Sequence, residues 1–135
     1  MKIERELMRG AGPVAVLKLL NRREMYGYEL VETLAERTDG ALAMGQSTLY
    51  PMLYNLEAQG FVEGYWKEAG TKGADGSRDR KYYRLTDKGK TRLAEDSKQW
   101  EAVIRAMKAL GVASLAIPRV SLVSVSSALR IGANP

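Results

Sequence analysis

The chain contains no cysteine and no histidine among its 135 residues. Without cysteine it has no thiolate nucleophile, no disulfide and no zinc–thiolate site. Without histidine it lacks the commonest general base, the commonest metal ligand and any Ser-His-Asp triad. An enzyme is therefore disfavoured, because only scattered Glu, Tyr, Lys and Ser remain for chemistry. The length fits one domain with an arm or tail, and excludes two independent catalytic domains.

The chain also lacks a long apolar run and an apolar N-terminus. No uninterrupted apolar stretch approaches the ~20 residues that span a bilayer. The first seven residues are too charged for the apolar region of a signal peptide. We therefore expect a cytoplasmic protein with no membrane partner.

Positive charge is present but unevenly distributed. The formal net charge is +5 and the sequence pI is about 9.5. Residues 67–92 hold nine basic and four acidic residues, whereas residues 22–66 hold three basic and seven acidic ones. A merely solvated surface more often mixes the two signs. The concentration of positive charge in residues 67–92 favours contact with a polyanion.

Apolar periodicity predicts a mostly α (α+β) fold. The predicted helices span residues 2–21, 26–37, 47–59 and 86–110. In the first, Gly12-Pro13 predicts a kink or a fresh helix start, which leaves residues 2–9 as an arm. In the second, Leu30, Leu34 and Val31 are expected to face the core, and Asp39-Gly40 ends the helix.

The third predicted helix is expected to present one face to solvent or to a groove. Pro51 is tolerated in a first turn, so the helix is expected to begin near Ser47 or Thr48, whose hydroxyls cap free amides. Its apolar stripe consists of Leu49, Met52, Leu53 and Leu56. Between residues 46 and 59 there is no Lys or Arg.

Two aromatic-rich segments, residues 61–66 and 81–85, predict a two-stranded β-ribbon. Residues 69–76 form its loop, with a turn at Asp75-Gly76. Tyr82 and Tyr83 alternate across the ribbon, so one of them is expected in the core. A phosphate-cradling glycine loop is disfavoured because a strand, rather than a helix, follows the loop.

The last predicted helix carries an apolar stripe that resembles a short coiled-coil seam. The stripe consists of Leu93, Trp100, Val103, Ile104, Met107 and Leu110. Because the core closes without this helix, we expect the stripe to meet a second copy of the chain. The predicted organisation is a DNA-binding domain with its arm (residues 1–86), a dimerisation helix (87–112) and a tail without clear periodicity (113–135).

In order, these elements indicate a winged helix-turn-helix, an architecture that usually binds duplex DNA. Three motifs resemble the signature of the PadR-like transcriptional regulators: Tyr26-Gly27-Tyr28-Glu29-Leu30, Thr48-Leu49-Tyr50-Pro51 and Tyr82-Tyr83-Arg84-Leu85-Thr86. The resemblance covers roughly residues 4–110. It implies a homodimeric regulator, more often a repressor, that binds a palindromic DNA operator of the ATGT/ACAT type. It implies neither an enzyme nor a cofactor.

The candidate DNA contacts fall into three groups. Ser47, Thr48 and Asn55 are placed to bond base edges, with helix capping or plain surface exposure as the alternative. Lys72, Arg78, Arg80 and Lys81 are candidates for phosphate contacts, with a solvated hairpin as the alternative. The resemblance adds the hydroxyls of Tyr26, Tyr28 and Tyr50. Relatives often have a basic residue at position 55, where this chain has Asn. The contacts that position this chain on DNA must therefore come mostly from outside the third helix.

Trp100 has two interpretations. It is a bulky anchor of the dimer, or, as in some small PadR-like proteins with a single C-terminal helix, it lines a cavity between protomers and stacks on a planar aromatic effector. A different overall function also stays open: a small-molecule or protein-docking module without specific DNA binding. The uncharged third helix favours that alternative, and the basic ribbon disfavours it.

Overall fold

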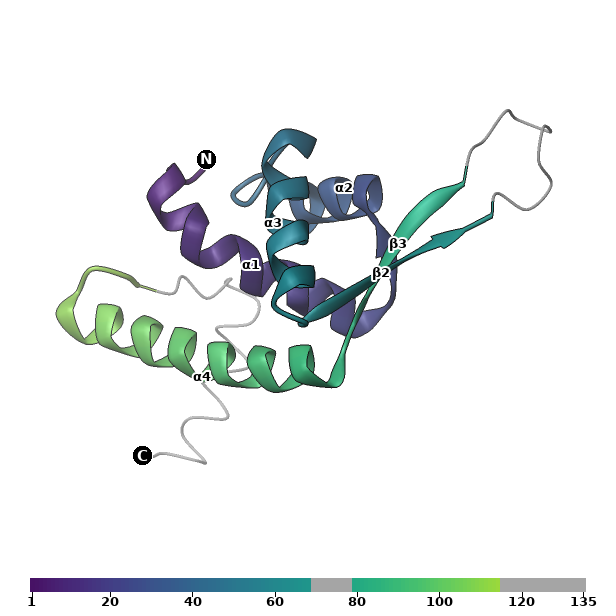
Figure 1. The fold of residues 1–135 in the computed structure, drawn as a ribbon. Helices are drawn as coiled ribbons and strands as arrows, with labels where there is room; N and C mark the ends of the chain where they lie inside the picture. Colours follow the sequence, from purple (N-terminus) through teal and green to yellow (C-terminus); the bar gives the residue numbers. More distant parts are fainter. Residues whose placement is uncertain (69–78, 115–135) are drawn as a thin grey trace, which may run out of the picture. The chain divides into compact units, whose positions relative to one another are not determined.

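The computed structural model describes residues 1–68 and 79–114 and has four helices and three short strands in that part of the chain (Figure 1). The helices are α1 (Arg5–Arg22), α2 (Gly27–Arg37), α3 (Gln46–Ala58) and α4 (Asp87–Leu110). The strands are β1 (Met25–Tyr26), β2 (Val62–Lys67) and β3 (Arg80–Leu85). The mostly helical winged fold predicted from the sequence is thus confirmed.

The chain divides into two compact units, Met1–Lys98 and Gln99–Pro135. The helix α4 contributes its first part to one unit and its second part to the other. The first unit contains residues on both sides of the predicted boundary at residue 86, and that boundary stays a prediction. None of the helices in the described residues is both long and apolar enough to span a bilayer.

The first helix runs through Gly12-Pro13 without a break, so the predicted fresh helix start there is wrong, and the alternative of a kink stays a prediction. α1 runs from Arg5 to Arg22 with Pro13 inside it, and Met8 in the expected arm is buried in the core. Pro13 removes one backbone hydrogen bond. The burial of Val16 and Leu17 on the same helix offsets that loss, because each fully buried side chain contributes about 1.5–3 kcal/mol.

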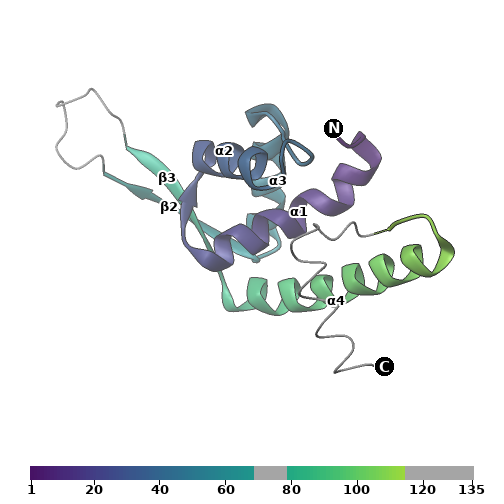
Figure 2. The same cartoon turned by 180° about the vertical axis from the view of Figure 1, so that it is seen from behind.

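The next two helices form the helix-turn-helix. α2 packs against α1 and α3, and α1 also contacts β3 (Figures 1 and 2). Leu30 and Leu34 are buried, as predicted. The predicted stop after α2 is confirmed by the positive φ angles of Asp39 (52°) and Gly40 (85°).

The start of α3 differs from the prediction. The helix begins at Gln46 with Gly45 as its N-cap, and neither Ser47 nor Thr48 provides the side-chain cap. Pro51 consequently lies in the second turn, where its missing amide leaves the carbonyl of Ser47 without its helical partner. Both residues lie on the exposed face of α3, where water can bind that carbonyl.

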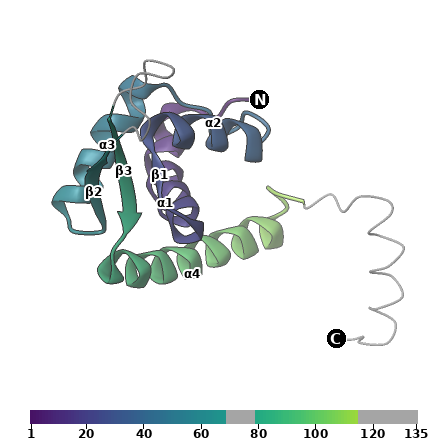
Figure 3. The same ribbon diagram turned by 90° about the vertical axis from the view of Figure 1, so that its right-hand side faces the viewer.

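The sheet has three strands rather than the two predicted. Its order is β1-β3-β2, and both pairings are antiparallel (Figure 3). Met25 pairs with Tyr83 and Tyr26 with Tyr82. The two residues of β1 lie directly before α2, so this extra strand fixes the start of the helix-turn-helix to the ribbon.

The hydroxyl of Thr86 forms hydrogen bonds that link the end of α3 to the start of α4. Thr86 Oγ1 donates to the carbonyl of Gly60, 2.6 Å away, and accepts a hydrogen bond from the amide of Gly89 at 3.0 Å. The second bond satisfies one free amide in the first turn of α4. A Cβ atom at position 89 would overlap the carbonyl oxygen of Phe61, so only glycine allows this close approach.

The core extends into α4. Leu93 belongs to the same buried cluster as Leu17, Leu53 and Tyr83. The expectation that the core closes without the last helix is therefore wrong for its first two turns. Tyr83, at 1% exposure, is the core member of the Tyr82-Tyr83 pair, as the alternation predicted.

Candidate nucleic-acid interface

One side of α3 is exposed and uncharged. Leu49, Leu53 and Leu56 bury the opposite side in the core. The exposed residues are Gln46, Ser47, Thr48, Pro51, Tyr54, Asn55, Ala58 and Gln59. Hydroxyls and amides of this kind suit base edges in a major groove. The structure thus presents all three predicted base-contacting residues, Ser47, Thr48 and Asn55, on one helix face.

Tyr50 lies at the edge of this face and is half-buried. Its hydroxyl occupies the space next to Gly27, the first residue of α2. Its ring centroid is 6.3 Å from that of Tyr54, which is exposed. Tyr50 therefore connects α3 to the start of α2.

The outer face of the sheet carries alternating tyrosines and cations. Tyr26, Tyr65 and Tyr82 lie on the face opposite the core residue Tyr83, because neighbouring strand residues point to opposite sides. The ring centroids of Tyr26 and Tyr82 are 5.4 Å apart, and those of Tyr65 and Tyr82 are 6.0 Å apart. We call these three residues the tyrosine row.

Cations cover the tyrosine row. The guanidinium carbon of Arg80 lies 4.5 Å from the Tyr26 ring centroid, and Lys67 Nζ lies 5.0 Å from that of Tyr82. Each such contact is worth ~0.5–1 kcal/mol at an exposed site. Tyr26 therefore holds Arg80, a predicted phosphate contact, in a defined position on the wing, the ribbon of β2 and β3.

At the far end of the tyrosine row the charge is neutralised. Arg84 pairs with Glu63 (Nε to Oε1, 3.0 Å) and lies 4.7 Å from the Tyr65 ring centroid. The hydrogen bond to Glu63 raises the pKa of the Arg84 guanidinium. The Tyr65 hydroxyl donates to Glu24, and this bond raises the pKa of Tyr65 above its usual value.

Lys81 lies on the opposite side of the ribbon, next to α3. Its Nζ is 3.5 Å from Glu57 Oε1, and Glu57 also accepts the amide of Gly64 at 3.3 Å. Glu57 thereby holds the wing against α3. The ring of Tyr83 lies beneath Lys81, and burial, followed by the charge of Glu57, raises the pKa of Tyr83 to about 12.

The second part of α4 is exposed in the chain. Val103, Ile104, Met107 and Leu110 form an exposed apolar stripe at helical spacing, and Trp100 is half-buried. Leu93, the first residue of the predicted seam, instead packs in the core of its own chain. The accessible stripe therefore starts at Trp100.

The sequence of this chain is similar to those of known proteins. Residues 16–95 match the model of the transcriptional regulator PadR-like family. A protein of Lysinibacillus sphaericus described as uncharacterized protein X is 32% identical over 101 residues, which cover 75% of this chain and 88% of the relative. The chain belongs to the PadR-like family.

Solved structures of PadR-family regulators share the fold. A PadR family transcriptional regulator from Eggerthella lenta is 35% identical, with a TM-score of 0.66 over 81% of this chain and 88% of that one. A transcriptional regulator from Clostridium thermocellum is 26% identical, with a TM-score of 0.68 over 78% of this chain and 95% of that one. This PadR-like protein is accordingly a DNA-binding transcriptional regulator, and its relatives are not enzymes.

The structure brings most predicted site residues of this PadR-like protein to two surfaces. Ser47, Thr48 and Asn55 lie on α3, and Arg80 lies beside Tyr26 on the wing. Tyr28 is 49% exposed near the start of α2. Lys72 and Arg78 lie outside the described residues.

Sequence reasoning missed the acidic residues of the site. Glu57 on α3 holds Lys81, and Glu24 before β1 accepts from Tyr65. The spacing between Glu57 and Lys81 follows no local rule, since the pairing depends on how the wing folds back on α3. A lone Glu in an otherwise uncharged helix was the only signal in the sequence for that contact.

Proposed function

We propose that this PadR-like regulator acts as a homodimeric repressor in the cytoplasm, binding a palindromic operator with one α3 helix from each protomer. The observation that carries this proposal is the difference in chemistry between two surfaces. The exposed face of α3 has hydroxyls and amides but no cation, whereas the wing presents Arg80 and Lys67 on its tyrosine row. Base contacts specify sequence and cationic contacts supply salt-dependent affinity.

In this mechanism each protomer contributes both kinds of contact. Ser47, Thr48 and Asn55 bond base edges in the major groove. Arg80 and Lys81, together with Lys72 and Arg78, bind flanking phosphates. The hydroxyls of Tyr26, Tyr28 and Tyr50 complete the phosphate contacts around the start of α2.

Dimerisation rests on the exposed stripe of α4. Val103, Ile104 and Met107 are apolar and accessible, and burying them against a second copy would remove apolar area from water. A planar aromatic effector that binds beside Trp100 between two protomers would change the spacing of the two α3 helices. Release from DNA then follows by population shift, because the operator fits only one spacing.

Fluorescence anisotropy with operator and random duplexes across a salt series tests the proposal. Arg80→Ala should weaken binding to both duplexes and lower the slope of log affinity against log salt by about one. Arg105→Ala removes the same charge from the exposed part of α4 and serves as the matched control. If Arg80→Ala binds as wild type does, or if affinity is insensitive to salt, the wing does not bind phosphates.

A second pair of variants tests base recognition. Asn55→Ala and Thr48→Ala should each reduce the preference for operator over random DNA, by ~1–3 kcal/mol where the side chain bonds a base through two hydrogen bonds, while leaving the salt slope unchanged. Gln99→Ala, which removes an exposed amide from α4 and not from α3, is the control. A wild-type protein that binds random and operator DNA equally would instead support a module without specific DNA binding.

A further inference from the structure

A cavity of about 200 Å³ opens between the second halves of α1 and α2, which pack against each other (Figure 2). All of its lining residues lie in the first compact unit. None of them belongs to α3 or to the wing, the two surfaces proposed to contact DNA. A ligand in this cavity is therefore recognised by α1 and α2 alone.

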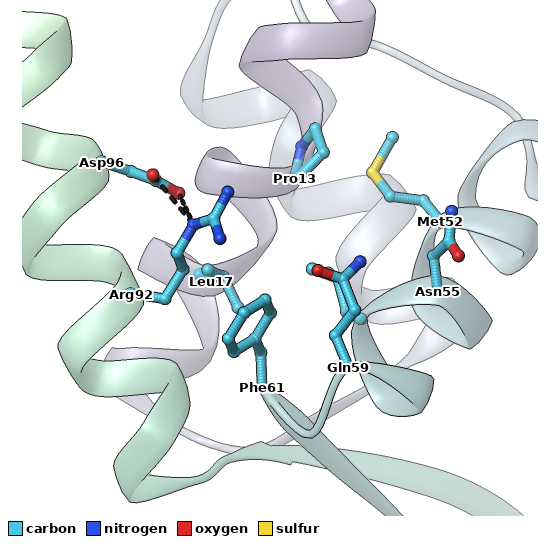
Figure 4. A pocket seen from close by; sticks show the side chains of 9 residues that line it. Pro13, Leu17, Met52, Asn55, Gln59, Phe61, Arg92 and Asp96 are labelled. Carbon is cyan, nitrogen blue, oxygen red and sulfur yellow. Dashed lines mark hydrogen bonds and ion pairs between the residues drawn. The ribbon is translucent and has the colours of Figure 1, made fainter.

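Three cations surround the cavity, and no Asp or Glu is among its lining residues in the described part of the chain. Lys18 and Arg22 come from α1, and Arg37 comes from α2. Within residues 1–68 and 79–114, none of the three side chains makes an ion pair or a hydrogen bond. The cavity in Figure 4 is different, because its guanidinium, Arg92, already pairs with Asp96 (Nε to Oδ1, 3.1 Å). The cations of the α1–α2 cavity keep all their donors for a ligand.

The helix dipole explains only part of this arrangement. Arg22 and Arg37 lie in the last turns of their helices, where a cation offsets the partial negative charge of the free carbonyls. Lys18 lies before the last turn of α1, so the dipole does not account for it. Three like charges around one cavity repel one another, and an anion bound among them would remove that repulsion.

The floor of the cavity is apolar. Ala15, Leu19 and Leu34 supply this surface, and Leu34 is fully buried. An apolar cavity of ~150 Å³ accommodates a benzene ring, so the volume leaves room for about one ring and a small charged group.

Two threonines also line the cavity, and they differ in what they can do. Thr38 Oγ1 donates to the carbonyl of Leu34 at 2.6 Å and accepts from the amide of Leu42 at 3.0 Å, so this hydroxyl holds the end of α2. The hydroxyl of Thr33, which is half-buried, makes no hydrogen bond within the described residues. Thr33 can therefore donate to a ligand.

We propose that this cavity binds the phosphate monoester group of a small molecule whose apolar part is about one ring. A phosphate monoester carries a charge of about −1.5 to −2 at pH 7 and has three acceptor oxygens, which match three cations better than a carboxylate does. The oxygens bind Lys18, Arg22 and Arg37, and the apolar part packs on Leu19 and Leu34. Phosphate also occurs in the nucleic-acid backbone, but the limited volume favours a small molecule.

Titration of the ¹⁵N-labelled full-length protein with phenyl phosphate, without DNA, tests the site. We expect saturable shifts of the backbone amides of residues 15–22 and 33–38. Arg37→Gln should weaken the affinity about tenfold, because a charge-assisted hydrogen bond is removed. Arg9→Gln, the same substitution at an exposed position of α1 outside the cavity, should bind as wild type does. Shifts that do not saturate, shifts centred on the wing, or wild-type affinity in Arg37→Gln would overturn the assignment.

The pH dependence gives a second readout. The affinity for phenyl phosphate should rise between pH 5 and pH 7, because the second ionisation of the phosphate has a pKa of about 6 and the chain has no histidine that would titrate there. Methyl phenyl phosphate keeps the ring but carries a single charge, so it should bind more weakly and show no such rise; equal affinity would rule out recognition of the dianion. Random duplex DNA should not displace phenyl phosphate, and displacement would assign these cations to the nucleic-acid backbone instead.

Discussion

The hydroxyl of Tyr50 occupies the space in which a side chain at Gly27 would lie. Tyr50 belongs to the Thr-Leu-Tyr-Pro motif of α3, and Gly27 belongs to the Tyr-Gly-Tyr motif that starts α2. The two motifs are therefore parts of one packed contact between the helices. Glycine at position 27 is explained by the absence of a Cβ atom.

This contact makes Gly27→Ala destabilising, although Ala is normally the better helix former. We expect a loss of about 1–3 kcal/mol in the free energy of unfolding, because the new methyl group displaces the Tyr50 ring. In a Tyr50→Ala background the same substitution should cost little. Urea denaturation of the four proteins measures the coupling.

The control is Gly10→Ala in α1, where an added Cβ meets no atom within 4 Å. It should stabilise the protein by about 0.5–1 kcal/mol. Equal effects of Ala at positions 10 and 27 would contradict the packing argument.

The hydroxyl of Thr86 is expected to stabilise the folded state. Thr86→Val keeps the shape but removes both the bond to the Gly60 carbonyl and the cap of the Gly89 amide. The expected loss is ~1–2 kcal/mol, measured as a lower midpoint of urea unfolding. Thr86→Ser, which keeps the hydroxyl, should retain most of the stability; if it is as unstable as Thr86→Val, the methyl group and not the hydroxyl matters.

Tyr83 should make the protein sensitive to alkali. Burial favours the neutral phenol and raises the pKa of Tyr83 from 10.0 to about 12. The neutral phenol therefore stabilises the folded state. That contribution is fully present below pH 10 and is lost as the pH rises toward 12. Thermal melts between pH 9 and pH 12 should show a smaller pH-dependent loss for Tyr83→Phe than for wild type. Tyr28→Phe, at an exposed position, should follow the wild-type curve.

The apolar stripe of α4 gives a prediction on assembly. Met107→Glu places a charge in the stripe and should convert a dimer of roughly twice 14.9 kDa into monomer, measured by sedimentation at micromolar concentration. Ala102→Glu puts the same charge elsewhere on the exposed helix and should leave the dimer intact. A monomeric wild-type protein would remove the basis for reading two half-sites.

Much of this fold follows from local sequence patterns. The helix at residues 27–37 was predictable because its apolar spacing and its stop signal agree, and the helix at residues 87–110 was predictable from its apolar spacing. The β-ribbon was predictable from its aromatic alternation. The predicted base-contacting residues lie on one face of α3 because a helix places them there whatever its neighbours do.

The failures have a common physical origin in tertiary contacts. Two residues, Met25 and Tyr26, are too few to show a period, and they form a strand only because β3 lies beside them. Pro13 stays inside α1 because buried neighbours offset the lost hydrogen bond. Pro51 predicts a helix start near Ser47 or Thr48, but α3 starts at Gln46, and Gly45 is therefore its N-cap.

The uncharged surface of α3 has a consequence for engineering. Residues 46–59 contain a single charged residue, Glu57, whose partner Lys81 lies in the wing. A graft of this segment into another PadR-like scaffold would therefore change the total charge of the host by little. The host would keep its own salt-dependent affinity for DNA and acquire a different sequence preference. The smallest transplantable part is the helix together with a lysine at position 81, because without that lysine Glu57 would face the incoming phosphates unpaired.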